Sequence, residues 1–420
     1  MRVLYISYFY PPLGGPAVLR NVKTVKYLAE SGIACDVITT REPEYLYRDS
    51  SLLAECREEK LMRTASLDPM SLLKKTGLSR DRGASRFYLQ TPERLKLAIR
   101  RLHPIDDKIG WVPFLIKAGR SALAARRYDL IYISLGPFSS ALGAYRLAEA
   151  NQLPLAVDLR DYWNLLSDYD LQGTRWQRRF SLHWERKIYR RAGLIVTATR
   201  GIGDDIACAF GSNLADKILT AYNGWDEADF TDLPAAEKQP GFTLAYFGNL
   251  YARRHLRAFY AAVKTLRVAG SLPKDTRILL YGNFFREAQQ DVAHSGISDL
   301  IQIVPQLDHW LALSQMLAAD VLLLAINSSS PRGTLSSKIF EYLRAQKPIL
   351  AMVPAQNEAA GLLRACNQDL ICAMESPDSI LHCLKRVLNE PLRQYHVPWE
   401  LERQAQIRKL AQTLQARFGN

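Results

Sequence analysis

The feature that most constrains this chain is a strand, turn and helix pattern that occurs twice. In its first occurrence, Arg2–Tyr8 is a short apolar run, Gly14 and Gly15 form a turn, and Ala17–Ser31 shows helical spacing. The run Asp36–Thr40 then resumes as a strand. This order predicts a βαβ unit, in which the two strands lie parallel.

The pattern restarts near the middle of the chain. A strand is predicted over Phe242–Phe247, Gly248 and Asn249 follow, and helix-like sequence continues to about Leu266. Other predicted strands share a nearly continuous apolar character, which is typical of parallel sheets covered on both faces. These strands are Leu130–Ser134, Leu155–Leu159, Leu194–Thr197, Arg277–Tyr281, Leu300–Val304, Val321–Ala325 and Pro348–Val353. Two such halves predict an α/β protein with two doubly wound domains.

The domain boundaries follow from where this alternation breaks. We predict a first domain over residues 1–225 and a second over 226–398, because polar sequence with prolines separates the two patterns near residues 223–241. Residues 399–420 are an amphipathic terminal helix. A basic stretch over about 42–128 does not fit the alternation, and we expect an insertion of helices and loops there.

The net charge of +13, from 55 basic and 42 acidic residues, indicates an anionic partner. Nucleic acid, a membrane surface and a phosphorylated substrate all fit this charge. The N-terminus lacks a secretory-signal pattern, no stretch provides the roughly 20 apolar residues of a spanning helix, and the six cysteines form no C-x-x-C pair. We therefore expect a cytoplasmic protein with reduced thiols.

The segment GTLSSKIFEYLRAQKPILA (Gly333–Ala351) resembles the donor-binding signature of the retaining glycosyltransferases of family 4, which have the GT-B fold. The likeness is to the subgroup that builds bacterial surface polysaccharides, and it runs nearly end to end. It implies two Rossmann-like domains facing a cleft, and transfer of a sugar, a hexose in our reading, from a nucleotide-sugar donor with retention. It implies no metal and no cofactor.

The resemblance also implies a role for each part of that signature. Backbone amides at the start of the helix would bind the donor diphosphate, as helix N-termini bind anions. They belong to Leu335, Ser336 and Ser337. Glu341 would accept hydrogen bonds from the ribose hydroxyls. Lys338 faces either the donor or solvent, and Gly333 stands where the family carries a glutamate that touches the transferred sugar.

Two glycine-containing loops are further donor-site candidates by resemblance. The segment LAYFGNLYARRH resembles the first strand and loop of the family's donor domain, where a following base contacts the diphosphate. Its candidate residues are Gly248, Asn249, Arg253 and Arg254. Arginine suits this role because guanidinium binds phosphate bidentately. The alternative is a pair of solvated arginines. Gly15 would line the cleft from the first domain, or would only allow a tight turn.

The segment LAVDLRDYW resembles a strand end of the same subgroup, and ligands of open α/β sheets bind at strand ends. Asp158, Arg160 and Asp161 would then reach the cleft, and Asp161 or Asp158 would polarise the acceptor hydroxyl. The alternative is a surface salt-bridge cluster. The segment Ala221–Phe230 resembles the interdomain crossover, with Tyr222 and Trp225 in place of the usual proline and valine, and the terminal helix resembles one that crosses back to the first domain.

The basic insertion carries aromatic residues, among them Phe87, Trp111 and Phe114. Basic and aromatic side chains together fit peripheral binding to anionic lipid at the inner face of the cell membrane, and a lipid-linked saccharide or cell-surface glycan precursor as acceptor. The alternative is a soluble basic surface. Competing functions are a GT-B-like nucleotide-sugar epimerase, an inactive scaffold and a nucleic-acid-binding protein, although no nucleic-acid motif is present. We interpret Asp168 and Asp170 as part of a surface loop.

Overall fold

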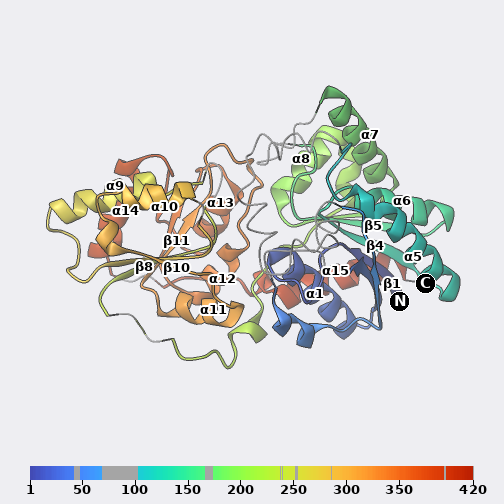
Figure 1. Cartoon of the computed structure of the whole chain (residues 1–420), viewed down its shortest axis with the longest axis horizontal. Helices are drawn as coiled ribbons and strands as arrows, with labels where there is room; N and C mark the ends of the chain where they lie inside the picture. Colours follow the sequence, from blue (N-terminus) through green and yellow to red (C-terminus); the bar gives the residue numbers. More distant parts are fainter. Residues whose placement is uncertain are drawn as a thin grey trace. The chain divides into compact units, whose positions relative to one another are not determined.

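The computed structural model describes residues 1–41, 48–68, 103–165, 174–236, 238, 240–250, 254–284, 286–391 and 394–419. The chain divides into two compact units (Figure 1). The N-terminal unit comprises Met1–Tyr222 and Gln404–Asn420, and the C-terminal unit comprises Asn223–Arg403. The unit boundary therefore lies three residues before the predicted one.

The described part of the N-terminal unit has a parallel sheet in the order β3-β2-β1-β4-β5-β6-β7. Its strands are β1 (Arg2–Ser7), β2 (Ala34–Thr40), β3 (Lys60–Thr64), β4 (Leu130–Leu135), β5 (Leu155–Leu159), β6 (Leu194–Thr197) and β7 (Ile218–Thr220). The order reverses direction between β1 and β4. Ligands of doubly wound sheets bind at the carboxyl ends of the strands beside such a switch point.

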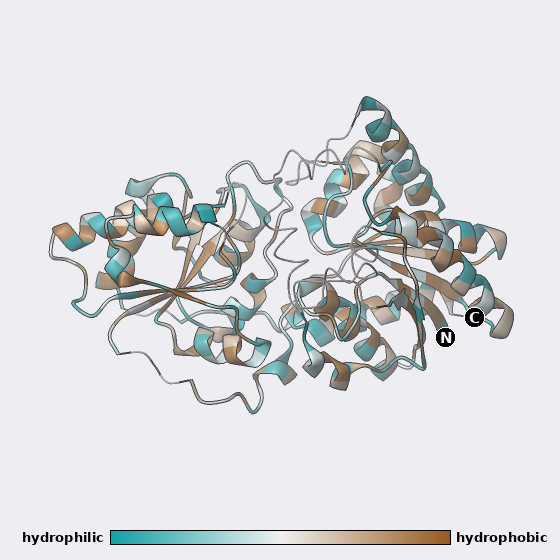
Figure 2. Ribbon diagram, viewed as in Figure 1, coloured by the Kyte–Doolittle hydropathy of each residue, from teal (hydrophilic) through white to brown (hydrophobic). Residues whose placement is uncertain are grey.

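Helices cover both faces of this sheet. On one face, α1 (Pro16–Glu30) and α15 (Arg403–Phe418) pack against apolar side chains of β1, β4 and β6. On the other face lie α5 (Val112–Ala125), α6 (Ser140–Ala150), α7 (Arg175–Arg191) and α8 (Arg200–Phe210). The described residues of this unit also form 3-10 helices at Ser50–Glu55, Ile109–Trp111 and Ser212–Lys217. The inner strands β1, β4, β5 and β6 are mostly apolar because both of their faces are buried (Figure 2).

The described part of the C-terminal unit repeats this plan with a parallel sheet in the order β10-β9-β8-β11-β12-β13. Its strands are β8 (Thr243–Phe247), β9 (Arg277–Tyr281), β10 (Ile301–Val304), β11 (Val321–Ala325), β12 (Ile349–Met352) and β13 (Ile371–Cys372). The switch point lies between β8 and β11.

The helices of the C-terminal unit also form two layers (Figure 1). The helices α9 (Arg257–Val268), α10 (Arg286–Ala293) and α14 (Pro377–Asn389) pack over one face of the sheet. The helices α11 (His309–Ala318) and α12 (Lys338–Ala345) lie on the other, and α13 (Glu358–Ala365) follows β12. Where the C-terminal unit is described, it also has 3-10 helices at Glu227–Phe230, Ser298–Leu300 and Trp399–Leu401.

The prediction of two doubly wound α/β domains is confirmed, and every predicted strand is present to within two residues at each end. The prediction that about 42–128 is only an insertion of helices and loops is wrong in part. Residues Lys60–Thr64 form β3, which extends the sheet beside β2, and α5 packs on the sheet. As an edge strand, β3 is half-exposed and carries Lys60, Arg63 and Thr64, so it lacks the apolar run of the inner strands.

Among the described residues, no helix combines the length and the apolar character that crossing a bilayer requires.

Candidate donor-binding site

The predicted donor residues of the C-terminal unit gather at its switch point. Gly248 directly follows β8, and the loop after β11 leads into α12. Because β8 and β11 are neighbouring parallel strands, their carboxyl ends place these two loops side by side.

Gly248 and Lys338 lie in close contact at this point. The backbone of Gly248 has a φ of +135°, which side chains rarely adopt, and its N–H donates to the carbonyl oxygen of Tyr281 at 2.8 Å. A Cβ atom at position 248 would lie 2.9 Å from Nζ of Lys338. The absence of a side chain at Gly248 therefore leaves the space that the lysine ammonium occupies.

Asn249 ties two of the strand-end loops together. Its side-chain Oδ1 accepts a hydrogen bond from the backbone N–H of Asn283, which follows β9, at 2.9 Å. Asn283 in turn donates from its side chain to Oε1 of Gln306, beyond β10, at 3.1 Å. Asn249 therefore shapes the rim at the strand ends, whatever contact it makes with a ligand.

Tyr342 positions α12 over the ends of the two central strands. Its hydroxyl accepts from the backbone N–H of Phe247 at 3.1 Å and donates to the carbonyl of Leu323 at 3.3 Å. Ile339 and Phe340 are buried beside it. These contacts place the start of α12 at the switch point.

The backbone amides before α12 are available to a ligand. Leu335, Ser336 and Ser337 are half-buried, and within the described chain their N–H groups donate no hydrogen bond. Ser337, the residue before the helix, makes no side-chain cap. The first amides of a helix carry partial positive charge and bind anions. The start of α12 therefore has the character of an anion-binding site.

Lys338 adds a cation to these amides. Its burial lowers the pKa of its ammonium, the Glu341 carboxylate works in the opposite direction, and Arg254 lowers the pKa further, so the pKa lies below its usual value. Within the described chain Nζ has no hydrogen-bond partner. The ammonium of Lys338 and the guanidinium of Arg254 are close enough to interact, and two neighbouring cations attract a bound dianion.

Glu341 is a half-buried acceptor without a partner in the described chain. It forms no hydrogen bond and no ion pair there. Its negative charge acts to raise the pKa of Lys338 on α12 and of His309 at the start of α11. A carboxylate whose oxygens have no partner in the described chain can accept hydrogen bonds from the hydroxyl groups of a ligand.

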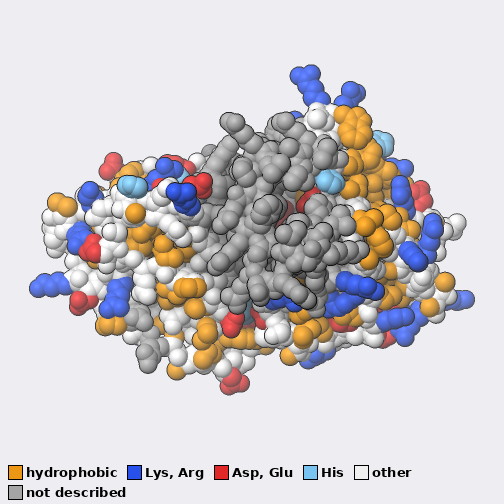
Figure 3. All heavy atoms as spheres, in the orientation of Figure 1, with side chains coloured by type: hydrophobic (Ala, Val, Ile, Leu, Met, Phe, Trp, Pro, Cys, Tyr) orange, Lys and Arg blue, Asp and Glu red, His pale blue; other side chains and the backbone are white. Residues whose placement is uncertain are grey.

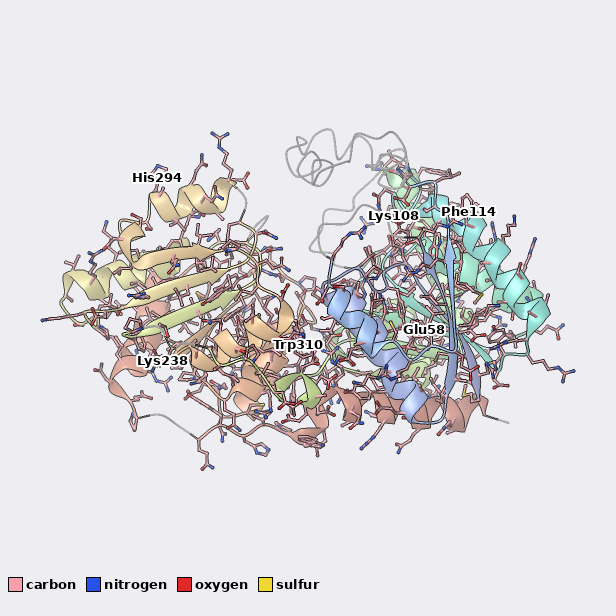
Figure 4. All side chains as sticks on the ribbon, turned by 60° about the horizontal axis from the view of Figure 1, so that its bottom comes forward. Glu58, Lys108, Phe114, Lys238, His294 and Trp310 are labelled. Carbon is pink, nitrogen blue, oxygen red and sulfur yellow. The ribbon has the colours of Figure 1, made fainter. Side chains whose placement is uncertain are left out.

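Sequence reasoning missed an acid–base pair close to Glu341. Nε2 of His309 lies 3.1 Å from Oδ2 of Asp229, which is buried. Burial acts to lower the pKa of His309, but the hydrogen bond to Asp229 and the charge of Glu341 outweigh it, so the pKa is raised. The ring also contacts Trp310, which Figure 4 labels. No motif signals this pair, because the two residues are 80 positions apart.

The segment resembling a crossover is anchored to α12. Arg344 donates from Nε and Nη2 to the two carboxylate oxygens of Glu227, both at 2.6 Å, and its guanidinium lies 4.9 Å from the ring centre of Phe230. The hydrogen bonds from Arg344 lower the pKa of Glu227. This clamp joins the first residues of the C-terminal unit to the helix that carries Glu341.

In the N-terminal unit, the expectation that Asp158 reaches a cleft is wrong. Asp158 is 0% exposed, on the face of β5 that α1 covers. Its two oxygens accept hydrogen bonds from Nε and Nη2 of Arg20 at 3.0 and 2.7 Å. Arg20 also donates to the carbonyl of Ala221 at 3.1 Å. Charged groups this deeply buried require such pairing, which explains the inward orientation of the carboxylate.

The other predicted residues of the N-terminal unit lie nearer the surface. Asp161 is exposed beyond β5 and has no partner within the described chain. Arg160 turns back to donate to the carbonyl oxygens of Leu135 and Gly136. Gly15 has a φ of 94° directly before α1, so its conformation serves the turn. Of these three predicted residues at the end of β5, only Asp161 therefore has a side chain with no partner in the described chain.

The comparisons with known proteins concern the family and the fold. Residues 20–224, just under half of the chain, match the model of the glycosyl transferase 4-like domain. Sucrose-phosphate synthase from Thermosynechococcus elongatus is a structural neighbour with a TM-score of 0.60 and 14% identity, over 99% of this chain and 96% of that one. The chain has a glycosyltransferase-like GT-B fold. No curated protein matches it at the sequence level.

Other GT-B neighbours carry nucleotide sugars and include a different enzyme class. UDP-GlcNAc 2-epimerase from Neisseria meningitidis, bound to UDP-GlcNAc, has a TM-score of 0.58 and 10% identity, over 99% of this chain and 100% of that one. An E. coli structure described as trehalose-6-phosphate, bound with UDP-2-fluoro glucose, has a TM-score of 0.58 and 14% identity, over 98% and 96%. Identities this low establish the fold alone.

Three predictions fall partly or wholly outside the described residues. Arg253, Asp168 and Asp170 lie there, as does most of the basic insertion, including Phe87. Trp111 is described and is 0% exposed, with its indole N–H donating to Oγ1 of Thr64, so the expectation that it enters a bilayer is wrong. Phe114, labelled in Figure 4, packs partly buried against the same core.

Proposed function

We propose that this GT-B protein is a glycosyltransferase that moves a sugar from a nucleotide-diphosphate sugar to an acceptor. The observation that carries the proposal is the start of α12, where unbonded amides, the ammonium of Lys338 and the carboxylate of Glu341 meet at the switch point. Amides and a cation suit a diphosphate, and a carboxylate suits the two hydroxyls of a ribose.

Each of these groups has a defined task in the proposed reaction. The amides of Leu335–Ser337, Lys338 and Arg254 hold the diphosphate and stabilise the negative charge that grows on it as it leaves. Glu341 orients the nucleoside. The hydrogen bonds and charge that these groups provide make a metal dispensable in this proposal. Gly333 supplies no side chain to the transferred sugar, so we expect backbone groups to contact it.

The acceptor side of the proposal depends on the N-terminal unit. Asp161 is our candidate to polarise the acceptor hydroxyl, because it is exposed at the carboxyl end of β5 and has no partner within the described chain. We propose a lipid-linked saccharide or a cell-surface glycan precursor as acceptor, a hexose as the transferred sugar, and retention at its anomeric carbon. We therefore propose that the protein acts in polysaccharide biosynthesis, in the cytoplasm and peripheral to the cell membrane.

A second candidate function is epimerisation of a nucleotide sugar. Two observations favour it. Several GT-B neighbours are UDP-N-acetylglucosamine 2-epimerases. The hydrogen-bonded pair His309 and Asp229 is also an acid–base couple, and the charge of Glu341 acts to raise the pKa of its imidazole. An epimerase converts UDP-N-acetylglucosamine in the absence of any acceptor. Nuclear magnetic resonance of that mixture separates the two activities, because a transferase leaves the sugar ring unchanged.

The test of donor binding is calorimetric titration of UDP, GDP and dTDP into the full chain. We expect one of them to bind, and Glu341→Ala to weaken it about 10- to 100-fold, since hydrogen bonds to a charged group contribute about 1.5–3 kcal/mol. Glu287→Ala is the matched control, because Glu287 is an exposed glutamate on α10 without a partner in the described chain. Unchanged affinity in Glu341→Ala refutes the ribose assignment, and no binding of any nucleotide refutes the transferase.

A further inference from the structure

Helix α7 carries a stripe of aromatic side chains on the outside of the N-terminal unit. Trp176, Phe180 and Trp184 are spaced four residues apart, so they follow one another along one side of the helix. Trp176 is 62% exposed and stacks on Phe180, with ring centres 5.5 Å apart. Phe180 meets Trp184 edge-on at 6.5 Å. We call these three residues the α7 aromatic stripe.

Basic side chains accompany this stripe. The helix has a single acidic residue, Glu185, which is buried. Its basic residues are Arg175, Arg178, Arg179, Arg186, Lys187, Arg190 and Arg191, of which the first six are exposed. At 100° per residue, Arg175, Arg179, Arg186 and Arg190 form a second stripe directly beside the aromatic one. Figure 3 shows hydrophobic and basic side chains together where α7 lies in Figure 1.

The opposite side of α7 anchors the helix, and Trp184 also packs, partly buried, against the core and edge-on against Tyr145, whereas Trp176 is exposed. Ser181 accepts a hydrogen bond from the indole of Trp163 at 2.9 Å, and Glu185 accepts from Asn164 at 2.8 Å. Thr174 and Gln177 form a capping box at the start of the helix. Lys187 lies 5.2 Å from the ring centre of Trp184, which keeps charge and aromatic surface together.

We propose that the outer side of α7 docks onto an anionic membrane surface. Tryptophan is enriched at the level of lipid headgroups because its ring is apolar and its N–H is polar, and arginines beside it attract anionic lipid. A helix with aromatic and cationic stripes lies in the interface plane. Trp176 and Phe180 stack on each other, so one face of each ring is already covered and fewer ring faces are left for the base stacking by which single-stranded nucleic acid binds.

This surface is made of α7 residues that belong neither to the donor-site candidates nor to the insertion over about 42–128, although Gln177 of α7 donates a hydrogen bond to the carbonyl of His103 in that insertion at 2.6 Å. Docking on α7 needs no nucleotide sugar, so it holds or fails independently of the transferase proposal. Together with that proposal it explains how an enzyme of this kind meets a lipid-linked acceptor: the N-terminal unit, which carries Asp161, rests on the bilayer.

The test is flotation of the full chain, without nucleotide, on phosphatidylcholine vesicles containing about one third phosphatidylglycerol. We expect binding at low salt that weakens as salt screens the arginines. Trp176→Ser with Phe180→Ser should reduce the bound fraction about tenfold or more. Arg175→Gln with Arg179→Gln should reduce it on anionic vesicles and flatten the salt dependence.

Matched variants control for loss of apolar surface and of charge. Trp399→Ser removes a tryptophan that is 59% exposed in the C-terminal unit, and Lys264→Gln with Lys274→Gln removes two exposed charges there. Both should float like the unmodified chain, and thermal unfolding should show that every variant is folded. Equal binding by Trp176→Ser with Phe180→Ser, or no binding of the unmodified chain to anionic vesicles, overturns the proposal.

Light scattering tests the other possible occupant of this face. If a second copy of the chain covers α7, the unmodified protein is a dimer that does not float with vesicles. In that case Trp176→Ser with Phe180→Ser converts the dimer to a monomer. That result also overturns membrane docking. A monomer that floats only with anionic lipid supports it.

Discussion

Substitution of Asp158 by asparagine tests whether this carboxylate has a structural or a catalytic role. Asp158 and Arg20 are 0% and 5% exposed, and two hydrogen bonds join them. The substitution leaves the guanidinium buried without its counter-charge. Breaking a buried pair in this way costs about 3–5 kcal/mol. Domains have only about 5–15 kcal/mol of stability, so the loss is a large fraction of the total.

The assay is calorimetric thermal unfolding of Asp158→Asn, of Arg20→Met and of the double variant Arg20→Met with Asp158→Leu. For a unit of this size we expect the unfolding transition of each single variant to fall by about 10 °C. An apolar pair of similar volume is often as stable as the ion pair, so the double variant should regain most of this loss. A shift equivalent to under about 1 kcal/mol in Asp158→Asn refutes this reasoning. Transferase activity in the folded double variant would exclude Asp158 from the chemistry.

Three other predictions concern Lys338, Glu185 and Gly248. Nucleotide affinity should fall as pH rises through the lowered pKa of Lys338, because the diphosphate binds the charged ammonium. Calorimetric titration of Lys338→Met between about pH 7 and pH 10 should show no such fall in affinity. Burial raises the pKa of Glu185 to about 7, so the protonated side chain stabilises the fold fully below about pH 4.5, and this stabilisation is lost as pH rises through 7. The free energy of unfolding should fall by about 3 kcal/mol over this range in the unmodified chain, and unfolding measurements on Glu185→Gln should not show this fall. Gly248→Ala should displace Lys338 and weaken nucleotide binding about tenfold, whereas Gly270→Ala, with a φ of +64° and no neighbour within 4 Å, should leave affinity unchanged. Equal affinity in Gly248→Ala and Gly270→Ala would contradict this steric argument.

Much of the fold could be predicted because local sequence reports burial. Strands such as Leu155–Leu159 and Val321–Ala325 are apolar along their length, and this property follows from helices on both faces of a parallel sheet. The missed strands β3, β7 and β13 lie at or beside sheet edges and are short or half-exposed, so their sequences carry a weaker pattern.

For the donor site, the sequence by itself determined where the candidate residues lie along the chain: a glycine after β8, and a lysine and a glutamate on one helix. Only the tertiary structure decided that Gly248 and Lys338 touch, that His309 finds Asp229, and that Asp158 turns inward to Arg20. The reason is physical. Periodicity encodes which side of an element is buried, but a contact between residues 80 or 138 positions apart depends on strand order and on which buried charges must be paired.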